Sequence, residues 1–169
     1  MRRHTLTHSP DSPAVDRVHI LDQGGRLDLG DRRIVSLRPP YYDAPEIAGF
    51  FDTKSRAYFS ADAFGALLDE PAESAEAIDA AQLRDGMTTW AAIDAPWLGQ
   101  MDEGALGRTL GDIERFDPSV ILSGHLPHAR GLTGQLTSIL SDAYRGGPAD
   151  APDHDYIEQL VEAARHATV

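Results

Sequence analysis

The chain has 169 residues, a formal net charge of -12 and no cysteine. This length suits one domain with a sizeable core, and the acidic balance argues against nucleic acid or an anionic membrane surface as partners, because both reward a basic surface. Without cysteine, disulfides and thiolate metal sites are excluded, so any metal must be held by nitrogen and oxygen ligands.

The first stretch, residues 1–16, is rich in turn-forming Ser, Pro and Asp, and we expect a loose N-terminal segment before a domain at 17–169. His4 and His8 are four residues apart, but their polar setting favours a frayed tail over a ligand pair. The basic start lacks the apolar core of a secretory signal, and no run is long enough to span a membrane. These features, with the absence of cysteine, predict a soluble cytoplasmic protein.

Short alternating or apolar runs separated by turn residues then predict a meander of strands at 18–21, 26–29 and 33–37. His19 lies inside the first run, where a partly solvated strand histidine is a better interpretation than a metal ligand. Residues 38–45 contain three prolines, which remove backbone donors, so this stretch must be a loop.

A hairpin is predicted next, with strands at 46–51 and 56–59 around the turn at 52–55. The second strand leads to Asp62, which precedes an apolar stretch at 63–68 and therefore sits at a strand-to-helix junction. Two interpretations compete for this carboxylate. It caps a helix, or it lies at the carboxyl end of a strand where α/β proteins collect ligands, and these residues alone favour the cap.

Helical spacing of apolar residues dominates the rest of the chain. After an acidic linker or lid at 67–79, we expect helices within 76–97, across 101–116, and at 132–144 and 156–166. The Met and Trp residues of these stretches are interpreted as packing residues.

A second strand end appears between the second and third of these helices. Residues 117–125 form a turn, a β-branched run and a small-residue exit that carries His125. This arrangement repeats the one at Asp62, a functional side chain at the end of a strand. His128 follows after Leu126 and Pro127 and could face the same cleft.

Three segments together resemble the second half of a metallo-β-lactamase-fold protein, and most of all the flavodiiron, oxygen-binding diiron branch. They are 60–65 (Ser-Ala-Asp-Ala-Phe-Gly), 25–34 upstream and 121–125 (Ile-Leu-Ser-Gly-His) downstream, and the resemblance spans 18–125. It implies an α/β fold, the second αβ half of a metallo-β-lactamase-like αββα sandwich, with a mixed sheet and helices on one face. The complete sandwich needs about a third more chain.

The same resemblance implies a metal centre in which Asp62 bridges two metal ions and His125 binds the second ion. It implies iron, zinc or manganese in the complete protein, and a small-molecule substrate or dioxygen-like ligand. Two ligands are too few for a closed or catalytic site, so we expect this chain alone to bind metal weakly or not at all.

The sequence departs from the family pattern at two places. It lacks the first-half cluster of His and acidic residues, and the loop at 38–45 lacks the histidine that completes the first site. Asp43 or Tyr41 would be the stand-in, giving an oxygen-rich site suited to iron or manganese, and His128 is a further weak candidate. The competing interpretation is that Asp43 only stabilises the turn before Pro45.

Two classes of function follow. The first is a metal-dependent hydrolase or diiron oxidoreductase whose metal site is incomplete in this chain, which leaves open whether the chain is itself an enzyme. The alternative is a non-catalytic metallo-β-lactamase-like binding or dimerisation module. Half of a sandwich leaves a sheet edge and an apolar face uncovered, which favours a homo-oligomer.

Overall fold

The computed structural model of the chain describes residues 21–44, 47–146 and 154–167. The predicted loose segment 1–16 lies outside them, and so does most of the predicted strand at 18–21. In chain order the elements are β1 (Arg26–Asp28), β2 (Arg33–Ser36), β3 (Phe50–Asp52), β4 (Ala57–Phe59), the short 3-10 helix η2 (Ala75–Ala77), α1 (Ala80–Asp94), the 3-10 helix η3 (Leu98–Gln100), α2 (Glu103–Phe116), β5 (Val120–Leu122), β6 (Ala129–Arg130), α3 (Thr133–Gly146) and α4 (His154–Ala167).

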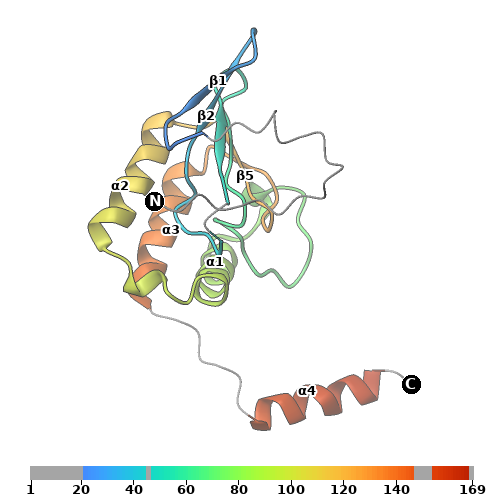
Figure 1. The fold of residues 1–169 in the computed structure, drawn as a ribbon. Coiled ribbons are helices and arrows are strands. Elements are labelled where there is room, and N and C mark those ends of the chain that lie inside the picture. The colour runs from blue at the N-terminus through green and yellow to red at the C-terminus, as the bar shows by residue number, and fades with distance from the viewer. Residues whose placement is uncertain (1–20, 45–46, 147–153, 168–169) are drawn as a thin grey trace, which may run out of the picture.

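The strands form one mixed sheet in the order β1-β2-β3-β4-β5-β6. Neighbouring strands are antiparallel except for β4 and β5, which are parallel and pair Ala57 with Val120 and Phe59 with Leu122. A parallel pair needs a long crossover, and the chain between β4 and β5 supplies one that contains α1 and α2. Figure 1 shows α2 and α3 along one side of the strands.

The two faces of the sheet differ in burial. From β2 to β6 one register row points toward the helices and is buried; it consists of Val35, Phe51, Tyr58, Ile121 and Ala129. These side chains join residues of α1, α2 and α3 in one core. On the opposite face Phe50 stacks on Phe59 with ring centroids 4.4 Å apart, and Phe50 stays 37% exposed. The predicted arrangement, helices on one face of a mixed sheet, is confirmed.

Acidic caps set where the first two long helices begin. The Asp79 carboxylate accepts hydrogen bonds from the amides of Ala81 and Gln82 at the start of α1. Asp102 does the same for Ala105 in α2. Such caps satisfy amides that have no partner within the helix. The predicted helices at 101–116, 132–144 and 156–166 are found within two residues of their expected bounds. None of the helices in the described part of the chain has the length and apolar character needed to cross a bilayer.

The prediction of a helix after Asp62 is wrong. Residues 61–64 form turns, and Ala61 and Phe64 have positive φ angles of 51° and 65°, which an α-helix does not allow. The amides of Ala66 and Leu67 donate instead to the carbonyls of His125 and Gly86. These long-range bonds replace the local bonds of a helix. The short strand β6 was also not foreseen, because two residues carry no periodicity.

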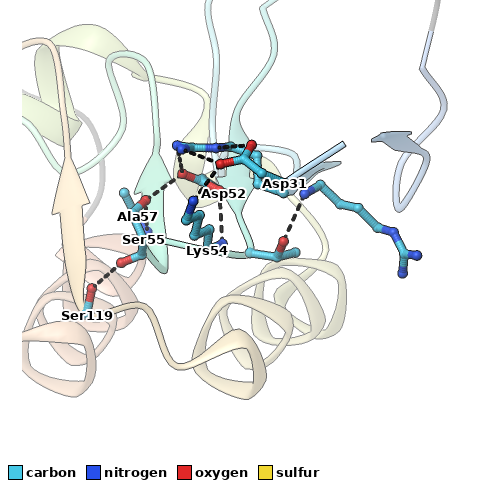
Figure 2. A network of polar contacts seen from close by, with 9 residues as sticks. Asp31, Asp52, Lys54, Ser55, Ala57 and Ser119 are labelled. Carbon is cyan, nitrogen blue, oxygen red and sulfur yellow. Dashed lines mark hydrogen bonds and ion pairs between the residues drawn. The ribbon is translucent and has the colours of Figure 1, made fainter. Parts of the chain in front are cut away.

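A polar network links the β3–β4 turn to the β1–β2 turn and to the start of β5 (Figure 2). The buried Asp52 carboxylate accepts hydrogen bonds from the Ser55 hydroxyl, the Lys54 amide and the Arg32 guanidinium. The Ser55 bond and then the Lys54 amide lower the pKa of Asp52. The Ser119 hydroxyl donates to the Ser55 carbonyl at 2.9 Å, so the turn is tied to the start of β5.

We expect Asp52→Asn to lower the melting temperature at pH 7, because the neutral amide replaces a carboxylate that accepts three hydrogen bonds. A lowered folded-state pKa means that this stabilisation is present above the unfolded pKa of about 3.9 and is lost as pH falls through the folded value. The difference between wild type and variant should therefore shrink below about pH 4 in thermal melts.

The matched control is Asp31→Asn. Arg32 and Lys54 lower the pKa of Asp31 to about 2, but this carboxylate is 56% exposed and its ion pairs are screened by salt. Its effect should vanish in high salt, whereas the effect of Asp52→Asn should persist. Equal melting temperatures for wild type and Asp52→Asn at pH 7 would contradict this account of the turn.

Candidate metal-binding site

The parallel pairing of β4 and β5 brings the ends of two distant segments to the same edge of the sheet. Asp62 follows β4 and His125 follows β5. Their side chains meet although they lie 63 positions apart in sequence, with 3.1 Å between Asp62 Oδ1 and His125 Nε2. The two site residues that the sequence favoured are therefore brought together. The Asp62 carboxylate contacts the His125 ring, and no helix begins after Asp62, so the interpretation of Asp62 as a helix cap is wrong.

Backbone hydrogen bonds continue past the two strands and fix the loops that carry these side chains. The Ser60 amide donates to the Leu122 carbonyl at 3.0 Å, and the Gly124 amide donates to the Ala61 carbonyl at 2.8 Å. The Ala66 amide reaches the His125 carbonyl at 3.0 Å. Main-chain hydrogen bonds thus hold the backbone on both sides of Asp62, and they hold it at Gly124 and His125.

The loop around Asp62 is strained. Ala61 and Phe64 both adopt left-handed backbone angles, which cost non-glycine residues about 1–3 kcal/mol each. The Phe64 side chain is fully buried, and the Ser60 hydroxyl donates to the Ala63 carbonyl at 2.9 Å, so packing and a local bond hold this conformation. Strain of this kind gathers at sites where a side chain must be presented in one direction.

Trp90 of α1 contacts both residues of the pair. Its Nε1–H donates to the Asp62 carbonyl at 3.1 Å, and its ring lies against the His125 ring with centroids 4.2 Å apart. Gly65 makes room for this indole, since a Cβ at position 65 would lie 2.5 Å from Trp90 Nε1. The interpretation of the Trp residues as packing alone therefore misses a role for Trp90.

Tyr41 is buried in the loop that precedes β3. Burial, and after it the charge of Asp94, raises the pKa of its hydroxyl, although interactions with the Phe64 backbone and the Trp90 side chain act in the opposite direction. The hydroxyl therefore keeps its proton at neutral pH. Tyr41 offers this neighbourhood a neutral hydroxyl, and the phenolate form that would bind a metal strongly is disfavoured.

Asp94, the last residue of α1, is a further acidic group of this neighbourhood that the sequence interpretation missed. Burial, followed by the charges of Asp62 and Asp43, raises its pKa. Its Oδ2 atom is buried and has no hydrogen-bond partner among the described residues. The available signal was its position, since a carboxylate at the C-terminal end of a helix opposes the helix dipole.

The weaker candidates are not gathered with the pair. Asp43 is exposed, and its negative charge is one of the causes that raise the pKa of Asp94. His128 is exposed too, and its carbonyl accepts a hydrogen bond from the Ala75 amide of η2. Across the described ranges, no group of three or more His, Asp or Glu side chains is close enough to hold a metal ion.

Comparisons with known proteins identify the fold. Neither a protein-family model nor a curated protein matches this sequence. Among solved structures, the flavodiiron protein of Giardia intestinalis matches with a TM-score of 0.60 and 20% identity over 76% of this chain. The rubredoxin oxygen:oxidoreductase of Desulfovibrio gigas matches with a TM-score of 0.58 and 19% identity over 75% of this chain. The chemotaxis sensor ODP, in a peroxy diiron state, matches with a TM-score of 0.60 and 19% identity over 85% of this chain.

These likenesses confirm the fold class expected from the sequence, the second αβ half of a metallo-β-lactamase-like sandwich. The chain spans 31% of the Giardia protein, 30% of the D. gigas protein and 56% of the sensor. At these identities the comparisons establish the fold alone.

We expect Gly65→Ala to lower the free energy of unfolding by about 1–3 kcal/mol, because the added methyl overlaps the Trp90 indole. Urea denaturation measures this loss. Tryptophan fluorescence should shift to longer wavelength, because Trp90 becomes more exposed to water. Gly107→Ala is the control: a Cβ there meets nothing within 4 Å, and α2 should gain about 0.5–1 kcal/mol. A Gly65→Ala protein as stable as wild type would show that the indole does not need this space.

Proposed function

We propose that Asp62 and His125 supply two ligands of a metal centre of the diiron oxidoreductase type, and that the remaining ligands come from polypeptide outside this chain. The observation that supports this most is the 3.1 Å approach of Asp62 Oδ1 and His125 Nε2 at the carboxyl ends of two adjacent parallel strands. The matched solved structures include a peroxy diiron species and an oxygen oxidoreductase.

The donor atoms fit such a centre in kind but not in number. A carboxylate can bridge two ions through its two oxygens, and imidazole nitrogen and carboxylate oxygen both suit iron. The buried Asp94 Oδ2, which has no hydrogen-bond partner in the described ranges, is an acceptor that a nearby cation would help to satisfy. Two ligands fall short of the three or more protein ligands of a catalytic metal, which is why the proposal assigns the others to another part of the protein.

The residues of this chain have separate tasks in the proposed centre. Asp62 and His125 bind, the Tyr41 hydroxyl offers a neutral donor, and the Asp94 carboxyl holds its proton to higher pH than an exposed aspartate would. Iron bound there would supply redox chemistry toward a small oxidant such as dioxygen. A zinc or manganese centre with hydrolase activity is the competing assignment, and metal preference separates the two.

Anaerobic titration with Fe(II), and separately with Zn(II), followed by calorimetry tests the proposal. We expect weak binding to the wild-type chain and a loss of at least about tenfold in affinity, or 1.4 kcal/mol, in Asp62→Asn and in His125→Gln. His154→Gln is the control, since that ring pairs with Glu158 on α4. Equal binding by wild type and both site variants would overturn the assignment of the ligands. A tightly bound metal pair in this chain alone would overturn the need for outside ligands.

A second candidate function is a non-catalytic binding or dimerisation module, and the sheet face opposite the helices favours it. Leu27 of β1 is 41% exposed and Phe50 of β3 is 37% exposed, and their registers place both on this face. Apolar surface of this kind is removed from water when another layer packs on it.

Sedimentation in about 0.15 M salt, which screens the repulsion between chains of net charge -12, tests this second function. We expect concentration-dependent self-association of the wild-type chain and weaker association of the double variant Leu27→Thr and Phe50→Thr. Ile93→Thr, an exposed apolar position on α1, should behave as wild type. A monomer at every concentration would count against the module.

A further inference from the structure

We infer that Trp90 is a positioning residue for the Asp62–His125 pair, holding the Asp62 loop through its indole N–H and the His125 ring through its aromatic face. The metal-related consequence rests on the proposed function, whereas the positioning itself can be measured in the metal-free protein. The two contacts are made by different parts of one ring, the edge and the face, so they exist at the same time.

The indole is itself held in place. Trp90 lies in the middle of α1, between Met87 and Ala91, which are both buried in the core. The absence of a side chain at Gly65 lets the indole lie against the backbone of the Asp62 loop. A ring carried by a core helix and packed against a glycine has little freedom, so it holds what it touches in a fixed position.

The pair needs such support because it is far from buried. The His125 side chain is 45% exposed and the Asp62 side chain is 30% exposed. Half-exposed side chains sample several rotamers, and ordering them on binding costs conformational entropy. The His125 ring stacks on the Trp90 indole, with ring centroids 4.2 Å apart, and this contact removes part of the entropic cost before any ligand binds. Partners behind a metal ligand typically change metal affinity by about 10–100-fold when they are removed.

Two substitutions separate the two contacts. Trp90→Phe keeps an aromatic face for His125 but loses the N–H that donates to the Asp62 carbonyl. Trp90→Leu loses both. Trp97→Phe is the matched control, because Trp97 is the second tryptophan of the chain and lies outside α1, at the N-cap of η3.

The first measurement uses NMR on the metal-free protein, with the His125 signals assigned by comparison with His125→Gln. We expect the ring current of Trp90 to shift the His125 ring protons upfield in wild type. This shift should be kept in part in Trp90→Phe and lost in Trp90→Leu. The carbonyl carbon of Asp62 should move in both Trp90 variants, because both lose the hydrogen bond. Trp97→Phe should leave both sets of signals in place.

The second measurement repeats the Fe(II) and Zn(II) titrations. We expect Trp90→Leu to weaken binding by about 10–100-fold and Trp90→Phe to weaken it less. A wild-type chain that binds neither metal would overturn the proposed function, while the NMR measurement would still decide the role of Trp90. Unchanged His125 and Asp62 signals in Trp90→Leu would overturn the positioning role. If Trp90→Leu does not fold, an Asp62 carbonyl signal in Trp90→Phe identical to that of wild type overturns it.

Discussion

The parallel pairing of β4 with β5 is the constraint on which the rest of the structure depends. Parallel neighbours cannot be joined by a tight turn, so the chain between them must cross over, and it does so through α1 and α2. That crossover covers one face of the sheet and builds the core. The same pairing points both strand ends to one edge, and its backbone bonds continue into the loops of Asp62 and His125.

Local rules are broken around this edge, as they also are at Arg56 and Asp117, which take left-handed angles before β4 and β5. Ala61 and Phe64 take left-handed angles, and at the end of α1 Asp94 has a buried carboxylate oxygen that finds no partner in the part of the chain that the structure describes. Away from the edge, Asp79 and Asp102 cap their helices as their positions predict. A fold tolerates strain and unpaired polar atoms where other contacts hold them, and sites that bind ligands are where such exceptions gather. The Trp90 indole packed against Gly65 is one of the contacts that hold this edge together.

The sheet has a partly uncovered face, and the proposed pair of metal ligands lacks a third. One face of the sheet is buried under helices, while the other exposes Leu27 and Phe50. The edge brings together one carboxylate and one imidazole, and the described residues contain no third ligand close enough to share a metal. The chain spans 31% of the Giardia flavodiiron protein and 56% of the chemotaxis sensor, and the proposed function assigns the missing ligands to polypeptide outside this chain.

Sequence alone determined what depends on neighbours along the chain. Alternating runs predicted β2, periodic apolar residues predicted α2 and α3, and turn residues predicted the β3–β4 hairpin, because each of these patterns is local. It also singled out Asp62 and His125, each at the end of a strand. Tertiary structure alone decided that the two side chains meet at 3.1 Å, that no helix follows Asp62, and that Trp90 contacts both residues of the pair. Their roles arise from contacts between segments tens of residues apart, and the geometry of such contacts is set by the crossover and the packing of α1, which leave no periodic trace in the sequence.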